Sequence, residues 1–387
     1  MMKKVCVVTG TRAEFGLLSP VIEKIHQDEE LELQLVVTGS HLIPELGNTQ
    51  IEIKNAGFPI YARIPISMGN DTNADMAAST GEAMTAFAHY FKDNSPDLVI
   101  ILGDRFEIFA VAAAAALQNI PIAHIHGGET TDGAVDEFLR HSVTKMSYLH
   151  FTACEEYRKR VIQLGEFPER VYNVGALGVE NVMKLPEMSM RDLSESLDFD
   201  LFDKEYSVVT LHSVTQEEGS SEKSLRELIK AMDEFPGMNY IITKANADAG
   251  GRLINQIWEE EAKQHKNWLV VASLGAKRYL TALKGSKMMI GNSSSGILEA
   301  PALAIPTINI GNRQKGRMMA ESIINCEPNK TSICEAMEKA LSRAFKEEIS
   351  SMKAPFGDGN TSEKIMKIIK QWLKEDHTTI AKSFYDI

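Results

Sequence analysis

Residues 97–127 read DLVIILGDRFEIFAVAAAAALQNIPIAHIHG, a pattern that decides the fold class. The segments 97–104 and 120–127 carry short apolar runs, and the alanine-rich segment 105–119 between them has the length of a helix. The apolar runs are continuous rather than alternating, which is typical of strands that are buried on both faces. The stretch therefore predicts two strands of a parallel sheet joined by a helix, in a sheet with helices on each side.

The same alternation of apolar runs and amphipathic segments fills the rest of the chain. It predicts strands at 3–10 and 31–39, and it starts again after a polar stretch near 185–205. The second half carries further strand-like runs at 206–212, 238–246, 267–273, 287–292 and 306–311. We therefore expect two doubly wound, Rossmann-like α/β domains that face a cleft, because such domains bind ligands beside the carboxyl ends of their strands.

The domain ranges follow from this pattern and from length. A chain of 387 residues is too long for one ordinary core, which favours two domains. The first domain is expected over residues 1–185 and the second over residues 186–365. The remaining segment, 366–387, carries a helix and a tail that could pack back on the first domain.

Composition argues against several classes of partner. The formal net charge is −12 and no long run of lysine and arginine occurs, which argues against nucleic acid and against an anionic membrane surface. No apolar run approaches 18 residues, and the N-terminal run is too short for a signal peptide, so a cytoplasmic protein is expected. The four cysteines form no CxxC pair, which favours buried, reduced thiols.

Charged side chains follow the predicted strands of the first half. Arg12 lies in the loop TGTRAEFG, beside a helix N-terminus where anions bind, and Gly16 opens that helix. The loop is not GxGxxG, and no acidic residue ends the second strand to hold a ribose, so a nicotinamide dinucleotide is not expected. Asp104, Arg105 and Glu107 follow the next strand in LGDRFE, although a helix cap is an alternative role for Asp104.

The segment HIHGGETTDGAVDEFLRH, residues 124–141, holds the densest group of titratable side chains: His124, His126, Glu129, Asp136, Glu137, Arg140 and His141. Two histidines two positions apart suggest a metal, but they alternate along a strand and no thiolate or HExxH helix completes a site. Ion pairs at a helix start are an alternative role for Asp136 and Glu137. Carboxylates at neighbouring strand ends nevertheless indicate acid–base chemistry.

The second half offers polar loops in corresponding places. His212 ends a predicted strand at the position that matches Arg12, which favours a place in the cleft over a place in the core. Asn246 and Asp248 lie in the loop after the next strand.

The segment IGNSSSGILEAPALAIPTINIGNR, residues 290–313, places four small residues where a strand becomes a helix: Ser293, Ser294, Ser295 and Gly296. Backbone N–H groups, the helix dipole and hydroxyl groups converge there, which suits a diphosphate. Glu299, expected in the first turn of the helix, could accept both hydroxyls of a ribose or could simply compensate the dipole. Arg313 ends the next strand and could reach the same anion.

Together these segments resemble the hydrolysing UDP-N-acetylglucosamine 2-epimerases of bacterial capsule and surface-glycan synthesis. The resemblance covers nearly the whole chain and rests on TGTRAEFG, VVTGSHL, LGDRFE, HIHGGE, DEFLRHSVTKMSYLHF, VIQLGE, GNSSSG, INIGNRQKGR and the terminal FYDI. It implies a GT-B-type architecture, as in many sugar-nucleotide glycosyltransferases, without a metal or a nicotinamide cofactor. A homo-oligomer, either a dimer or a tetramer, is also expected.

The resemblance implies a role for each matching residue. The expected catalytic residues are Asp104, Glu129, one of Asp136 and Glu137, and His212. The expected contacts to UDP and the sugar are Arg12, Gly16, Arg105, His126, Asn246, His212, Ser293, Ser294, Ser295, Gly296 and Arg313, with Glu299 as the ribose ligand.

The implied reaction converts UDP-N-acetylglucosamine and water into N-acetylmannosamine and UDP for sialic acid synthesis. It proceeds by anti elimination of UDP to a glycal, followed by hydration. The alternatives are the same reaction on a UDP- or GDP-linked 2,4-diacetamido-6-deoxy sugar for legionaminic acid synthesis, a GT-B glycosyltransferase, and a sugar-nucleotide binding module. Ser213 stands where many relatives have proline, and Thr243 and Lys244 stand where small residues are common, which leaves the sugar open.

Overall fold

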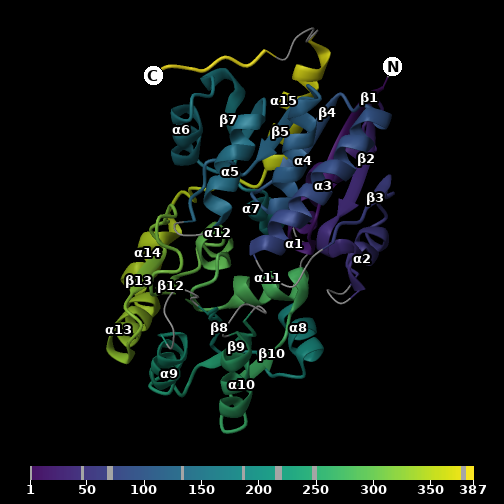
Figure 1. The fold of residues 1–387 in the computed structure, drawn as a ribbon. Coiled ribbons are helices and arrows are strands. Elements are labelled where there is room, and N and C mark those ends of the chain that lie inside the picture. Colours follow the sequence, from purple (N-terminus) through teal and green to yellow (C-terminus); the bar gives the residue numbers. More distant parts are fainter. Residues whose placement is uncertain are drawn as a thin grey trace. The chain divides into compact units, whose positions relative to one another are not determined.

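The computed structural model describes residues 2–44, 48–67, 73–131, 135–184, 188–213, 220–245, 251–375 and 381–387. The chain forms two compact units. Unit 1 comprises Met1–Asn181 and Phe356–Ile387, and unit 2 comprises Val182–Pro355. Each unit is built on a parallel sheet flanked by helices (Figure 1), so the expected class of two parallel-sheet α/β domains is confirmed.

The sheet of unit 1 has seven strands within the described residues, in the order β3-β2-β1-β4-β5-β6-β7. The strands are β1 (Lys3–Thr9), β2 (Leu31–Thr38), β3 (Ala62–Ile64), β4 (Leu98–Leu102), β5 (Ile122–Ile125), β6 (Leu149–Thr152) and β7 (Val171–Asn173). The chain winds outward from β1 to β3 and then returns to β4 on the other side of β1. The order therefore reverses between β1 and β4, and doubly wound sheets bind ligands at such a switch point.

Helices cover both faces of this sheet. They are α1 (Arg12–Gln27), η1 (Gly39–Leu42), α2 (Gln50–Asn55), α3 (Asn73–Asn94), α4 (Phe106–Leu117), α5 (Val135–Met146), α6 (Glu155–Gln163), η3 (Pro168–Arg170), α7 (Leu177–Lys184) and α15 (Thr361–Lys374). Along β1, Val5 and Val7 pack in the core beneath α1 and α15, whereas Cys6 and Val8 pack beneath α3, α4 and α5. This explains why the strand sequence is apolar at every position.

Unit 2 repeats the plan with the order β10-β9-β8-β11-β12-β13. Its strands are β8 (Tyr206–Thr210), β9 (Asn239–Thr243), β10 (Trp268–Val271), β11 (Met289–Gly291), β12 (Thr307–Ile310) and β13 (Ile323–Cys326). Its helices are α8 (Met190–Leu197), α9 (Ser220–Met232), α10 (Gly251–Ala262), α11 (Gly275–Gly285), α12 (Ser295–Ala302), α13 (Lys330–Leu341) and α14 (Arg343–Ser350). The switch point here lies between β8 and β11.

The chain leaves unit 1 within α7 and returns to it at Phe356. The return is hydrogen-bonded: the Ala176 N–H donates to the Phe356 carbonyl oxygen over 2.7 Å, and the Ser362 N–H donates to buried Glu180 over 2.5 Å. The sequence analysis placed the two points where the chain passes from one unit to the other near residues 185 and 365. The second lies about ten residues earlier in the structure because Phe356 is buried in unit 1.

Two further features concern the helices and the cysteines. Among the described helices, none combines the length and the apolar character that a membrane crossing requires. All four cysteines are free thiols, but only Cys6 and Cys154 are buried, whereas Cys326 and Cys334 are partly exposed. The expectation of a fully buried set was therefore wrong for the latter two.

A buried ion cluster lies beside α5 in unit 1. His150 and Glu166 are both fully buried, with 3.0 Å between His150 Nε2 and Glu166 Oε2. Burial lowers the pKa of His150 to about 4. Burial acts to raise the pKa of Glu166, but hydrogen bonds led by that from His150 lower it from 4.5 to about 2. Lys145 also pairs with Glu166 over 2.6 Å.

This cluster predicts that the protein loses stability in acid in two steps. Both folded pKa values lie below their unfolded values, so the unfolded chain binds more protons and stability falls as the pH falls. The His150 contribution is lost between about 6.5 and 4, and the Glu166 contribution between 4.5 and about 2. We expect Glu166→Gln to lower the urea midpoint at pH 7 and to flatten its decline below pH 4.5.

The exposed neighbour Glu169 provides the control, because Glu169→Gln removes the same charge at an exposed position of η3, three residues away. An acid decline in Glu166→Gln as steep as in the wild type would show that other carboxylates govern it.

Candidate active site

The candidate site in unit 1 lies at the carboxyl ends of three adjacent strands. In the sheet, β1 pairs with β4, and β4 pairs with β5. Arg12 begins α1 shortly after β1. Asp104 and Arg105 follow β4, whereas His126 and Glu129 follow β5. Because parallel strands end at one edge of their sheet, these loops meet beside the switch point.

Arg140 of α5 joins two of these loops. Its side chain is only 3% exposed. Nε donates to Asp104 Oδ2 over 2.7 Å, and Nη1 donates to Glu137 Oε2 over 2.8 Å and to the Glu129 carbonyl oxygen over 2.9 Å. Burial disfavours the charged form of Arg140, but Asp104 and the neighbouring acids outweigh that cost and raise its pKa. A buried cation thus holds groups from the β4 loop, the β5 loop and α5 together.

Asp136 and Glu137 are adjacent in α5 but differ in environment. Glu137 forms the expected i,i+3 ion pair with Arg140, accepts a backbone N–H of the β5 loop over 2.6 Å, and lies 3.1 Å from His141 Nε2. Burial acts to raise the pKa of Glu137, but these donors lower it. Burial and the negative charge of Asp104 raise the pKa of Asp136. The two pKa values are therefore pushed apart, as an acid and a base require.

The two histidines of HIHGGE have different partners. His124 is fully buried, with Nε2 2.8 Å from the Gly103 carbonyl oxygen and Nδ1 3.2 Å from Thr144 Oγ1. Burial lowers the pKa of His124 to about 3, so the ring is neutral, Nε2–H donates to Gly103, and Nδ1 accepts from Thr144. His126 instead lies beside Glu129, with 3.4 Å between Nδ1 and Oε1. His124 lies within β5 and His126 follows its end, so the two histidines have separate environments, although not because they alternate along one strand.

The β5 loop requires glycine at Gly128. This residue has φ +81°, and a Cβ there would lie 2.4 Å from the Tyr157 carbonyl oxygen of α6. His126 also has a positive φ, of 65°, which is uncommon for a residue with a side chain. The loop is therefore held in a strained path that places Glu129 beside the Arg140 group.

A pair of buried carboxylates that the sequence analysis did not assign surrounds Arg105. Its Nε lies 2.7 Å from Glu107 Oε1 and 3.9 Å from Glu14 Oε1, and Glu14 Oε2 accepts the Gly10 N–H over 2.7 Å. Burial, with repulsion from Glu107, raises the pKa of Glu14 to about 8. Arg105 thus lies beside two buried carboxyl groups, of which Glu14 has the raised pKa. The sequence did contain a signal for this pair. Glu14 lies in TGTRAEFG after β1, Glu107 lies in LGDRFE after β4, and these two strands are paired.

Arg12 is the first residue of α1 and Gly16 lies in its second turn, so the expectation that Gly16 opens the helix was wrong. Arg12 Nε pairs with Glu52 Oε2 of α2 over 3.0 Å, and both side chains are about half exposed. The Gly16 carbonyl oxygen accepts from Asn181 Nδ2 over 2.7 Å. An anion bound by Arg12 would therefore compete with a solvent-exposed carboxylate, which costs little because exposed ion pairs are weak.

In unit 2, Asn292 hydrogen-bonds three residues around the end of β11, and two of them are candidates. Its Oδ1 accepts the His212 N–H over 2.7 Å, and its Nδ2 donates to the His212 carbonyl oxygen over 2.9 Å. Its own carbonyl oxygen accepts from Arg313 Nη1 over 3.0 Å and from buried Gln314 Nε2 over 2.8 Å. The sequence analysis named His212 and Arg313 but missed Asn292, which connects them.

The preceding residue, Gly291, allows β11 to approach β8. It has φ +134°, and a Cβ there would lie 1.9 Å from the Thr210 carbonyl oxygen. No other residue fits that position without moving a strand. The GN pair of GNSSSG therefore sets the geometry at this switch point.

The serines lie at the start of α12, as expected. Ser294 is the N-cap residue, and its side chain makes no cap hydrogen bond. Ser295 Oγ accepts from Tyr279 Oη over 2.7 Å, and the Ser295 N–H donates to Ser293 Oγ over 3.4 Å. At Gly296, a Cβ would lie 2.7 Å from Thr307 Cγ2, so glycine lets α12 pack on β12.

Glu299 lies in the second turn of α12, so its expected place in the first turn was wrong. The helix begins only at Ser295, because Ser293 and Ser294 form the turn that precedes it. No acidic residue occupies the first turn of α12, all of which the structure describes. The positive end of the helix dipole therefore has no carboxylate of its own to compensate it, which favours an external anion. Burial raises the pKa of Glu299.

Asn246 and Asp248 lie outside the described residues, so their expected roles stay predictions.

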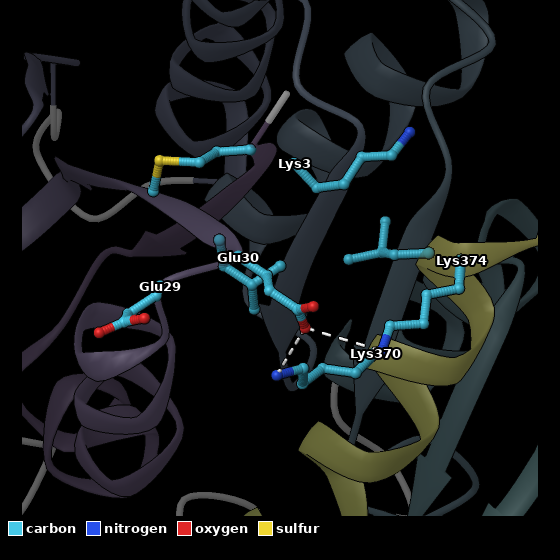
Figure 2. A pocket seen from close by; sticks show the side chains of 8 residues that line it. Lys3, Glu29, Glu30, Lys370 and Lys374 are labelled. Carbon is cyan, nitrogen blue, oxygen red and sulfur yellow. Dashed lines mark ion pairs between the residues drawn. The ribbon is translucent and has the colours of Figure 1, made fainter.

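A surface hollow of about 470 Å³ lies at the opposite edge of the unit 1 sheet (Figure 2). It borders Lys3 and Leu31, which begin β1 and β2. Figure 2 shows Glu30 paired with Lys370 and Lys374 of α15, at 3.0 Å and 3.7 Å. The hollow therefore lies at the amino ends of the strands, away from the candidate site.

Known proteins resemble this chain along its whole length. The chain is 41% identical over 387 residues to the GDP/UDP-N,N'-diacetylbacillosamine 2-epimerase (hydrolyzing) of Campylobacter jejuni, covering 100% of this chain and 99% of the relative. It is 38% identical to the polysialic acid biosynthesis protein P7 of Escherichia coli, covering 100% and 98%. The crystal structure of the UDP-GlcNAc 2-epimerase from Neisseria meningitidis bound to UDP-GlcNAc has a TM-score of 0.83 at 18% identity, covering 95% and 100%, which shows a shared fold.

The model of one protein family gives the assignment. It is described as UDP-N-acetylglucosamine 2-epimerase and matches residues 23–370, which include every described strand except β1 and most candidate residues. Together with the relatives above 30% identity, this match establishes that the chain belongs to the UDP-N-acetylglucosamine 2-epimerase family.

Proposed function

We propose that the protein is a hydrolysing 2-epimerase that converts UDP-N-acetylglucosamine and water into N-acetylmannosamine and UDP, in the cytoplasm and for sialic acid synthesis. The observation that carries the proposal is the group of acids around Arg140, in which the pKa of Asp136 is raised and that of Glu137 is lowered. A glycosyltransferase leaves C2 of the sugar untouched and needs no such group. The role of the Escherichia coli relative in polysialic acid biosynthesis supports this pathway.

The chemistry explains why several acids are needed. The C2 hydrogen of the sugar is a poor acid, because no carbonyl adjoins it, and it becomes acidic only as the bond from C1 to UDP breaks. A carboxylate then removes that proton as UDP leaves, which forms a C1=C2 double bond. Water then adds its hydroxyl at C1 and gives its remaining proton to a carboxylate, while a carboxylic acid delivers a proton to the opposite face of C2. Each such proton transfer is worth roughly 10²- to 10⁴-fold in rate.

Of the two adjacent acids in α5, we assign proton transfer to Asp136. A group that alternates between its two protonation states works best with a pKa near the operating pH, and the pKa of Asp136 is shifted in that direction. Glu137 is held by Arg140, His141 and a backbone N–H, so we assign it the positioning of Arg140. Asp104 and Glu129 complete the proposed catalytic set.

We assign UDP to residues of both switch points. In unit 2 these are the first turn of α12, Arg313 and His212, with Glu299 as the ribose ligand. Arg12 and Arg105 contribute positive charge from unit 1. An anion at the N-terminus of α12 meets backbone N–H groups and the positive end of the helix dipole, which stabilise a departing diphosphate.

A second candidate substrate is a UDP- or GDP-linked 2,4-diacetamido-6-deoxy sugar. The Campylobacter jejuni relative, named for N,N'-diacetylbacillosamine, favours it, because that protein is 41% identical over the full length. The two candidates share the chemistry at C1 and C2 and differ at C4 and C6, which the acids around Arg140 do not discriminate.

The reaction can be tested by turnover in deuterated water. We expect release of UDP and of a manno-configured sugar that carries one deuterium at C2, because the returned proton comes from solvent. A panel of UDP-GlcNAc and the UDP- and GDP-linked diacetamido sugars, compared by kcat/KM, identifies the substrate. N-acetylmannosamine incubated with the enzyme controls for exchange after release, and a product without deuterium at C2 would contradict the mechanism.

The carboxylate assignment predicts that adjacent residues respond differently. Asp136→Asn should lower kcat by about 10²-fold or more with UDP affinity unchanged, because it removes a proton-transfer group. Glu137→Gln should lower kcat less and lower the thermal midpoint more, because it leaves Arg140 buried with one acid fewer. Steady-state kinetics, calorimetry with UDP and thermal unfolding measure these effects. Equal kcat values in the two variants would reject the division of roles.

The nucleotide assignment predicts a loss of UDP affinity in Arg313→Ala. A charge-assisted hydrogen bond is worth about 1.5–3 kcal/mol, so the dissociation constant should rise by about tenfold or more. Lys315→Ala is the matched control, since it removes one positive charge from an exposed position two residues away. If calorimetry gave both variants the affinity of the wild type, the diphosphate would have to bind elsewhere.

A further inference from the structure

The tail formed by residues 381–387 lies against the carboxyl end of α5. Lys382 Nζ donates to the carbonyl oxygens of Lys145 and Ser147, each over 2.6 Å, and to that of Thr144 over 3.4 Å. The last carbonyl groups of a helix have no partner within the helix and carry the negative end of its dipole. An ammonium group from the end of the chain therefore caps α5.

Further contacts fix the position of the tail. Lys382 Nζ also pairs with buried Glu166 over 2.8 Å. The Tyr385 N–H donates to the Gly165 carbonyl oxygen over 3.0 Å, and its ring lies 5.3 Å from that of Phe167. Gly165 has φ +84°, and a Cβ there would lie 2.2 Å from the ring of Phe384. The tail is thus held by a salt bridge, a backbone hydrogen bond and ring contacts rather than by one side chain.

The capped helix carries the candidate acids. Asp136 and Glu137 lie in the first turn of α5, and Arg140 follows one turn later. The capped end is also bonded to the β4 loop, because Thr144 Oγ1 donates to neutral His124, which in turn donates to the Gly103 carbonyl oxygen. Gly103 directly precedes Asp104. The tail therefore contacts the end of α5, and the same end is linked through His124 to the loop that holds Asp104.

We propose that the C-terminal tail is a positioning element for the active site, with Lys382 as the positioning residue that holds α5 in its catalytic placement. The inference rests on the proposed function, because it assigns a consequence for catalysis to the acids of α5. Lys382 touches no reacting group. Its loss should therefore act through the distances among Asp136, Arg140 and Asp104 rather than through the binding of UDP.

The experiment compares Lys382→Met, Lys382→Arg and a chain that ends at residue 380. Lys382→Met keeps the aliphatic stem but removes the charge and all three carbonyl hydrogen bonds, and Lys382→Arg retains a cation with donors. Lys364→Met is the matched control, because Lys364 forms an ion pair with Asp358 at the surface of unit 1. We measure kcat and KM on the best sugar of the panel, UDP affinity, thermal midpoint and hydrogen exchange of residues 135–146.

We expect Lys382→Met and the truncated chain to lose about tenfold in kcat, which is one lost interaction of about 1.4 kcal/mol in the transition state. UDP affinity should stay within twofold, exchange of α5 should rise, and Lys382→Arg should recover most of kcat. A folded Lys382→Met with unchanged kcat would overturn the inference. A loss of activity no larger than the loss of folded protein would overturn it too. If the wild type turns over no sugar of the panel, the proposed function fails. In that case hydrogen exchange still tests the tail: unchanged exchange of α5 in Lys382→Met would show that the tail does not hold this helix.

Discussion

A buried guanidinium cannot be neutralised in a protein, so the structure around Arg140 has to supply its counter-charges. Arg140 is 3% exposed and takes them from Asp104 and Glu137, with a third acceptor in the Glu129 carbonyl oxygen. Asp104 and Arg140 are 36 residues apart in sequence, and they meet because β4 and β5 are adjacent. The placement of the candidate acids is therefore a condition for burying Arg140 and not an independent feature.

The same constraint separates the acids electrostatically. Glu137 is bonded to Arg140, and its pKa falls, whereas Asp136 faces the charge of Asp104 and its pKa rises. Arg105 likewise lies beside the carboxyl groups of Glu107 and Glu14, and burial and repulsion from Glu107 raise the pKa of Glu14. Two cations thus organise the acids at the ends of β1, β4 and β5, and each leaves one carboxyl group with a raised pKa, namely Asp136 and Glu14. Of these two, the proposed reaction assigns proton transfer with the sugar to Asp136 and not to Glu14.

The sequence predicted the fold class and the loops of the site for a clear physical reason. Continuous apolar runs mean strands buried on both faces, and parallel strands bring their following loops to one edge. It did not predict Asn292, whose role depends on the backbone of His212 brought next to it across the sheet. It misplaced Glu299 by one turn, because three consecutive serines do not show which of them begins the helix. The contacts of Lys382 also escaped, since they join residues 235 to 238 positions apart.

The two units of this chain, whose net charge is −12, offer an anion different surroundings. Unit 1 concentrates carboxylates, so an anionic substrate approaching it is repelled unless cations are close by. Unit 2 instead offers a helix start with no acid in its first turn and an arginine anchored on the Asn292 carbonyl oxygen. Such a site attracts a diphosphate through backbone dipoles and one local charge, without a basic surface. Under the proposed function, the leaving group is therefore held where the protein is least negative, and the proton transfers take place where carboxylates can be kept in both protonation states.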